Sequence, residues 1–143
     1  MAIVYFEQEV KSNLKDKRRL STYLQSMIRT HLSDVKKINI NYIFCSDEYL
    51  LGINKQFLQH DTLTDIITFD LSENDNIMDA EIYVSVERVS ENAKKFGVTY
   101  VHELHRVIFH GALHLCGFKD KKVEEVKAMR AAEEDCLNCY FHG

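Results

Sequence analysis

Hydrophobic and polar positions along the chain follow two different periods, which separate strand-like from helix-like segments. Residues 38–44 alternate between apolar and polar side chains, a pattern typical of a half-buried strand. Residues 17–32 place their apolar side chains at helical spacing, and the short apolar run 2–6 predicts an edge strand. Further strands are predicted at 64–71 and 81–86, and further helices at 49–57, 86–96, 100–116 and 121–138.

The predicted order is β-α-β-α-β-β-α-α-α. Two strands follow one another across the turn sequence Ser-Glu-Asn-Asp-Asn at 72–76, with no helix between them. This order predicts an α+β fold, with a small mixed sheet of about four strands packed against about five helices.

Composition indicates one compact cytoplasmic domain. The chain has 143 residues, no proline and five glycines, with no linker or repeat, so we expect a single domain over residues 1–143. Its start, MAIVYFEQEVK, lacks the features of a signal peptide, and no apolar run approaches the roughly 20 residues of a membrane span. In the cytoplasm, the four cysteines are expected to be thiols.

The formal net charge of −4 has the wrong sign for binding nucleic acid through bulk charge, although a local basic patch such as Lys119, Lys121 and Lys122 is compatible with it. Taken alone, such clusters are more typical of solvated turns.

The sequence His110-Gly-Ala-Leu-His114-Leu-Cys-Gly117-Phe-Lys-Asp120 carries the candidate chemistry. On a helix, His110 and His114 lie one turn apart on the same face. Gly117 can end the helix with a left-handed residue, so that the chain turns back and brings Asp120 to the histidines. This spacing predicts a three-ligand metal site with an open position for water.

Zinc is the expected metal, with manganese or magnesium as alternatives because Asp120 is a harder ligand than histidine. The spacing matches the metal helix of metzincin peptidases, but Gly111 stands where H-E-x-x-H enzymes place their general base.

Several segments resemble the YbeY family, the bacterial single-strand-specific metallo-endoribonucleases of ribosomal RNA maturation. HGALHLCGFKD resembles the family's H-G-x-L-H-L-x-G-Y/F-D-H, and NKQFLQHDTLTDIITF at 54–69 resembles N-x-x-Y-R-x-x-D-x-x-T-D-V-L-S-F. Residues 81–85 resemble the family's G-D-I-x-I-S strand more weakly. Glu125 and Met129 fit the family's E-x-x-x-M.

The resemblance implies metal ligands at His110, His114 and Asp120, on a helix beside the sheet. It also implies a metal-dependent endoribonuclease that uses a metal-activated water in 3′ end processing of ribosomal RNA and in ribosome quality control. The implied partners are single-stranded ribosomal RNA and the small ribosomal subunit or its proteins.

Two departures from the family pattern bear on catalysis. Asp120 replaces the usual third histidine, and Leu58 replaces an arginine suited to phosphate binding. Arg106, one helical turn before His110, is our candidate for the missing charge, and an ion pair with Glu103 is the alternative interpretation.

Lys55 and His60 are weaker candidates for the same role. Asp65 is expected to orient a ligand histidine through its free N–H, or else to cap a turn. No general base is identified.

Two other functions stay open. A ribosome-assembly or RNA-binding factor with a structural metal is compatible with Leu58 and Asp120. A zincin-like metallopeptidase fits the ligand spacing, but Gly111 disfavours it.

Overall fold

The computed structural model describes residues 2–58 and 64–143, so the candidate His60 lies outside the described residues. Its elements follow the predicted order. The strands are β1 Ala2–Glu7, β2 Lys37–Cys45, β3 Ile66–Asp70 and β4 Ile77–Ser85. The helices are α1 Lys17–His31, α2 Asp47–Ile53, the π-helical turn η1 Asn54–Leu58, α3 Val86–Phe96, α4 Tyr100–Leu115 and α5 Val123–His142.

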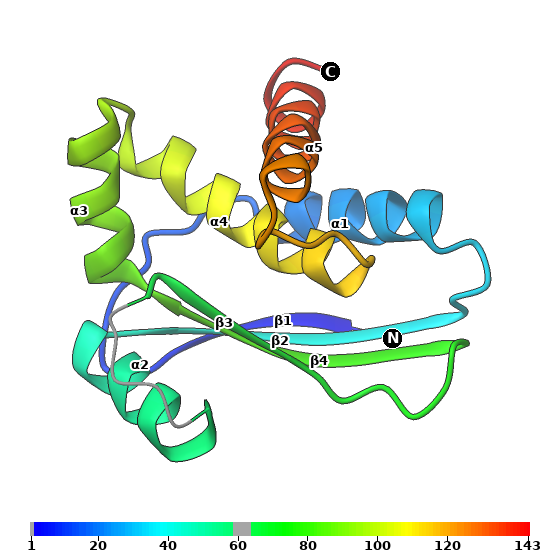
Figure 1. Ribbon diagram of the computed structural model, residues 1–143, viewed down its shortest axis with the longest axis horizontal. Coiled ribbons are helices and arrows are strands. Elements are labelled where there is room, and N and C mark those ends of the chain that lie inside the picture. The colour runs from blue at the N-terminus through cyan, green and yellow to red at the C-terminus, as the bar shows by residue number, and fades with distance from the viewer. Residues whose placement is uncertain (1, 59–63) are drawn as a thin grey trace.

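The strands form one mixed sheet in the order β1-β2-β4-β3. β1, β2 and β4 are parallel to one another, and β3 pairs antiparallel with β4. Helices α1, α3, α4 and α5 lie on one side of this sheet and α2 on the other (Figure 1). The predicted α+β fold is confirmed.

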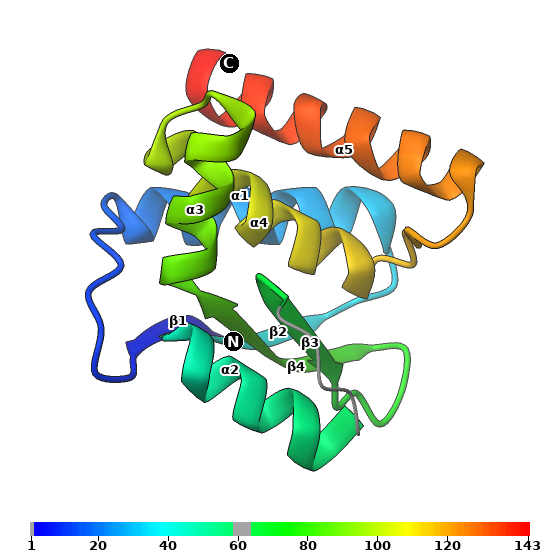
Figure 2. The same ribbon diagram turned by 60° about the vertical axis from the view of Figure 1, so that its left-hand side comes forward.

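The core lies between the sheet and α4. The alternating positions of β2, Ile38, Ile40, Tyr42 and Phe44, are all fully buried, as the sequence pattern predicted. The Tyr42 hydroxyl donates a 2.9 Å hydrogen bond to the backbone carbonyl of Ile108 and so ties the central strand to α4. Helix α4 is covered by the sheet below and by α5 above (Figure 2).

Helix α4 begins and ends where the sequence predicted. The Thr99 side chain accepts a hydrogen bond from the backbone N–H of His102, which caps the first turn. At the other end Gly117 has a positive φ of 100°, which glycine adopts without strain. The chain can therefore turn sharply after the second histidine of the motif.

Three elements differ most from the prediction: β4, α2 and α5, which spans Val123–His142 rather than residues 121–138. β4 begins at Ile77 rather than at residue 81, because its early residues pair with β2 from Lys37 onward. The predicted helix 49–57 begins at Asp47, where Ser46 caps it, and becomes a π-helical turn from Asn54. The hydrophobic period of a sequence carries no information about pairing with a neighbouring strand. It also does not distinguish a π-helical turn from an α-helical one.

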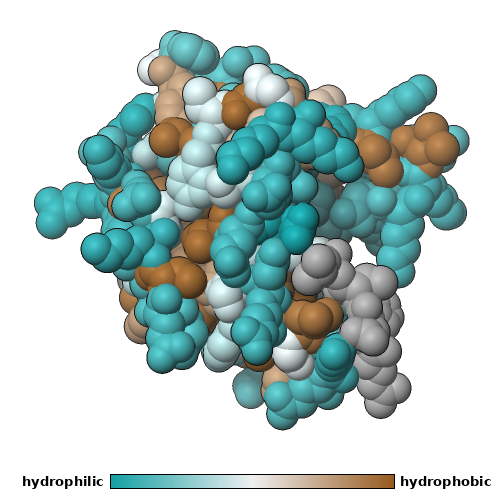
Figure 3. All heavy atoms as spheres, turned by 90° about the vertical axis from the view of Figure 1, so that its left-hand side faces the viewer, coloured by the Kyte–Doolittle hydropathy of each residue, from teal (hydrophilic) through white to brown (hydrophobic). Residues whose placement is uncertain are grey.

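None of the helices in the described part of the chain is long and apolar enough to cross a membrane. On the side of the molecule that α3 faces, hydrophobic side chains are scattered among hydrophilic ones (Figure 3).

Candidate metal centre in the cleft beside the sheet

The three predicted ligands come together at the end of α4. The Oδ2 atom of Asp120 lies 3.2 Å from Nε2 of His110 and 3.2 Å from Nε2 of His114. One ligand atom from each residue lies within 4.8 Å of the others. Tetrahedral metal bonds of about 2.0–2.2 Å place neighbouring ligand atoms about 3.3–3.6 Å apart, so the two distances from Asp120 are close to those around a single small cation.

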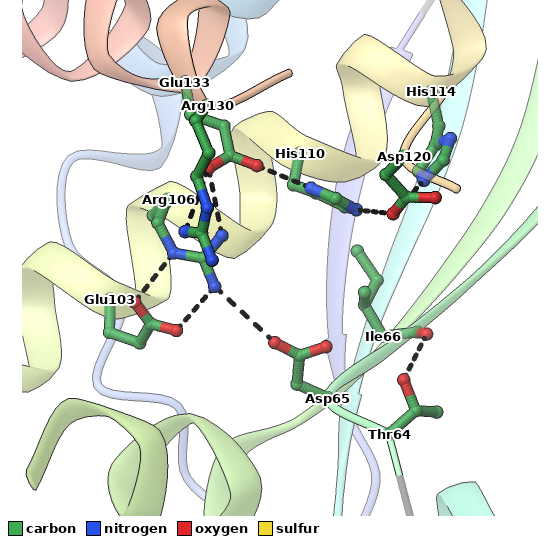
Figure 4. Close-up of polar contacts among 10 residues, drawn as sticks. All are labelled: Thr64, Asp65, Ile66, Glu103, Arg106, His110, His114, Asp120, Arg130 and Glu133. Carbon is green, nitrogen blue, oxygen red and sulfur yellow. Dashed lines mark hydrogen bonds and ion pairs between the residues drawn. The ribbon is translucent and has the colours of Figure 1, made fainter. Parts of the chain in front are cut away.

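Local structure explains this convergence. The helical repeat brings the His110 and His114 rings to a centroid distance of 4.7 Å. The backbone N–H groups of Gly117 and Phe118 bond to the carbonyls of the last helical turn, which closes the helix end. The chain then returns past the helix end, and Asp120 faces both imidazoles (Figure 4).

The ligand group opens into a cleft of about 870 Å³ that extends from β3 to α3 and α5. The side chains of His110, His114 and Asp120 are 15%, 31% and 37% exposed, so a substrate can reach the site from this cleft. Thr64, Asp65 and Arg130 are among the other residues that line it.

Glu133 orients His110. Its Oε2 atom lies 2.6 Å from Nδ1 of His110, and its side chain is only 2% exposed. Burial alone would raise the pKa of Glu133, but hydrogen bonds from His110 and Arg106 hold that pKa below its usual range. An ionised Glu133 therefore accepts the Nδ1–H of His110, which leaves Nε2 as the nitrogen that faces Asp120.

Sequence reasoning missed Glu133. The available signal is a carboxylate on the buried face of α5, where the other buried residues are Met129, Cys136, Leu137 and Tyr140. An acidic residue within such a stripe is rarely buried without a partner. The identity of that partner, 23 residues earlier in the chain, is set only by packing.

Arg106 is enclosed by carboxylates. It donates hydrogen bonds of 2.8 and 2.7 Å to Glu103 and of 3.0 Å to Glu133, and its Nη2 atom lies 3.8 Å from Asp65. Its side chain is only 12% exposed. Burial would lower its pKa, but the carboxylates around it raise the pKa above the usual value, so Arg106 stays charged. The ion pair with Glu103 is thus observed, and a phosphate-binding role of Arg106 stays a prediction.

Asp65 faces Arg106 rather than the three proposed metal ligands (Figure 4). Asp65 was expected to orient a ligand histidine, and for His110 that role falls to Glu133, which is bonded to its Nδ1. Burial raises the pKa of Asp65 above its usual value, in spite of the nearby charge of Arg106. Asp65 is therefore linked to the ligands through Arg106 and Glu133.

Gly111 has a structural reason to be glycine. A Cβ atom built there would lie 2.9 Å from Cδ1 of Ile66 and 3.1 Å from two side-chain atoms of Ile82. The side chain that a peptidase would use as its general base therefore has no room on this face of α4. The missing side chain at Gly111 lets α4 lie close to the sheet.

Comparison with known proteins gives consistent matches over nearly the whole chain. A family described as Endoribonuclease YbeY matches residues 4–140. The proteins named Endoribonuclease YbeY from Cytophaga hutchinsonii and Flavobacterium psychrophilum are 42% and 44% identical over 136 and 139 residues. These alignments cover 95% and 96% of this chain and 94% and 96% of the relatives.

Among solved structures, the solution structure of TM1509 from Thermotoga maritima is similar, with a TM-score of 0.61 and 26% sequence identity. The alignment covers 98% of this chain and 89% of that one.

Proposed function

This chain belongs to the YbeY family of endoribonucleases, and on that premise we propose that it cuts single-stranded ribosomal RNA with a metal held by His110, His114 and Asp120. The observation that carries the proposal is the convergence of these three side chains in the wall of one cleft. The general activity, hydrolysis of RNA, follows from the family.

A divalent cation bound there would polarise a phosphodiester and lower the pKa of a coordinated water toward about 7. Zinc is the proposed ion, with manganese or magnesium as alternatives because one ligand is a carboxylate.

The protein's own residues position the chemistry. Glu133 fixes the orientation and tautomer of His110, because its ionised carboxylate accepts the Nδ1–H at 2.6 Å. Arg106 in turn holds Glu133 and Glu103, whose side chains are almost fully buried, so that neither carboxylate is left without a cation. The cleft leaves the histidine and aspartate side chains partly exposed to substrate.

The cellular setting is proposed from the family resemblance. We place the protein in the cytoplasm, acting in 3′ end processing of ribosomal RNA and in ribosome quality control, with the small ribosomal subunit as partner. The peptidase alternative is disfavoured by Gly111, which packs directly on Ile66 and Ile82.

The test combines metal content with RNA cleavage. Protein purified without chelator is compared with the variants His114→Ala and Asp120→Ala, and with His142→Ala as a control at an exposed position near the end of α5. We expect about one equivalent of metal in the wild type and the control, and its loss in both ligand variants. The loaded wild type should cleave a single-stranded RNA and spare its duplex.

Retention of metal by both ligand variants would contradict the assigned ligands. Metal binding without cleavage under zinc, manganese or magnesium would favour the non-catalytic RNA-binding alternative.

A further inference from the structure

The cleft is lined by both basic and acidic side chains, and the basic ones are the candidates for binding the RNA backbone. A polyanion is bound chiefly through Lys and Arg contacts to its phosphates. Among the described residues, three cationic side chains line the cleft: Arg106, Lys121 and Arg130. Asp65, Asp70 and Asp120 oppose them with negative charge.

The guanidinium of Arg106 is held in the protein interior by two buried carboxylates. All three of its nitrogens donate to Glu103 or Glu133, and these two carboxylates are 1% and 2% exposed. Moving Arg106 toward a substrate phosphate would leave buried carboxylates without their cation, which is strongly unfavourable.

Arg130 differs from Arg106 in both exposure and contacts. It lies on α5, one turn before Glu133, and its side chain is 56% exposed. Its Nη1 atom is 3.5 Å from Oε1 of Glu133, an oxygen that already accepts a 3.0 Å hydrogen bond from Arg106. A long contact to a shared oxygen holds an exposed side chain only weakly.

Arg130 lines the same cavities as the proposed metal ligands. Its side chain extends from α5 toward Arg106, and both guanidinium groups approach the same oxygen of Glu133 (Figure 4). Arg130 lines the large cleft and also a smaller adjoining cavity of about 200 Å³ that it shares with His110 and Asp120. An anionic group in the cleft can thus face the ligand group and this guanidinium at once.

We propose that Arg130 binds a phosphate of the RNA substrate beside the metal group, an inference that rests on the proposed function and adds a substrate-binding residue to it. The planar guanidinium presents paired N–H donors that match two phosphate oxygens. Lys121, the other exposed cation of the cleft, carries a point charge without this fork. Arg130 therefore positions the strand.

The test measures RNA affinity apart from cleavage. Binding of a single-stranded RNA oligonucleotide to the wild type, Arg130→Ala, Arg130→Lys and Lys127→Ala is followed by fluorescence anisotropy at several salt concentrations, with chelator present to prevent cleavage. Lys127 is the matched control, since it is exposed on the same helix but does not line the cleft.

We expect Arg130→Ala to weaken binding about tenfold at low salt and to reduce the slope of log affinity against log salt by about 0.7, the value of one phosphate contact on a single strand. Arg130→Lys should recover much of the slope but only part of the affinity. Lys127→Ala should leave both near the wild-type values. With metal restored, kcat/KM should fall in Arg130→Ala while metal content and Tm stay unchanged.

Equal affinity and equal salt slope for Arg130→Ala and Lys127→Ala, with a wild type that binds and cleaves RNA, would overturn this inference and leave the proposed function standing. A wild type that neither binds nor cleaves RNA would overturn both.

Discussion

Individual side chains around His110 divide into those that would hold the metal and those that hold the ligands. His110, His114 and Asp120 present their ligand atoms to one point. Glu133 and Arg106 lie behind them and keep the first histidine in one orientation. The metal ligands and the residues that orient them can therefore be tested by separate mutations.

Replacing Glu133 with Gln should weaken metal binding about 10–100-fold, because groups that orient a ligand histidine contribute on that scale. The neighbouring exposed Glu134 offers a matched control, Glu134→Gln, which should bind metal like the wild type. The measurement is a competition titration with a fluorescent zinc chelator, with circular dichroism to establish that each variant is folded. Equal zinc affinity in the two variants would show that Glu133 does not support the site.

Asp65 gives a prediction about pH. Its pKa is raised in the folded protein, mainly by burial, so its ionised form destabilises the fold at neutral pH. This penalty is absent well below the unfolded pKa, where the residue is protonated in both states. It grows as pH rises from the unfolded pKa toward the raised folded pKa, and it is complete above the folded pKa. Asp65→Asn should therefore raise the Tm at pH 7, by an amount that shrinks toward zero near pH 3, below the usual Asp pKa of about 3.9.

Thermal unfolding of Asp65→Asn and wild type at both pH values measures this difference. About 1 kcal/mol moves the Tm of a domain of this size by about 4 °C, so a rise of a few degrees is resolvable. A variant less stable than wild type at pH 7 would show that the contact with Arg106 outweighs the cost of burial.

Among the elements, helix α4, which carries His110 and His114, packs very closely against the sheet. Gly111 allows it, because a Cβ there would meet Ile66 and Ile82 at 2.9–3.1 Å. Gly52, in α2, has nothing within 4 Å of a Cβ position. Gly52 and Gly111 are thus helical glycines in opposite surroundings.

Gly52→Ala should stabilise the protein by up to about 1 kcal/mol through helix propensity. Gly111→Ala gains the same propensity but overpacks the interface, at a cost of about 1–3 kcal/mol, so a net loss of stability is expected. Chemical denaturation of both variants tests the contrast. A gain of stability in both would mean that Ile66 and Ile82 move aside freely.

For the molecule as a whole, metal binding and folding should be coupled. The ligands come from α4 and from the loop that leads to α5, so a bound cation joins two parts of the fold. A ligand that binds only the folded state adds about 2.7 kcal/mol at 100 times its Kd.

The Tm of the wild type should therefore rise as zinc is added, whereas that of His114→Ala should not. Differential scanning calorimetry over a zinc titration gives the measurement. A parallel rise in both proteins would point to zinc binding elsewhere on the chain.

The elements and the spacing of the proposed metal ligands could be predicted from the amino-acid sequence, because both depend on local geometry. Helix periodicity places His110 and His114 on one face, and Gly117 turns the chain toward Asp120, all within eleven residues. Alternation along residues 38–44 likewise predicted the buried face of β2. Local hydrogen bonding and side-chain direction are sufficient for these features.

The pairing of charged side chains, in contrast, depends on how distant parts of the chain pack together. Glu133 bonds to His110 and Arg106 across 23 and 27 residues of chain, and this pairing commits Arg106 to the interior while Arg130 stays exposed. No local period encodes such contacts, because they depend on how α5 packs over α4. The strand order, with β4 between β2 and β3, was decided in the same way. Long-range packing brings together groups whose spacing along the chain has no physical meaning of its own.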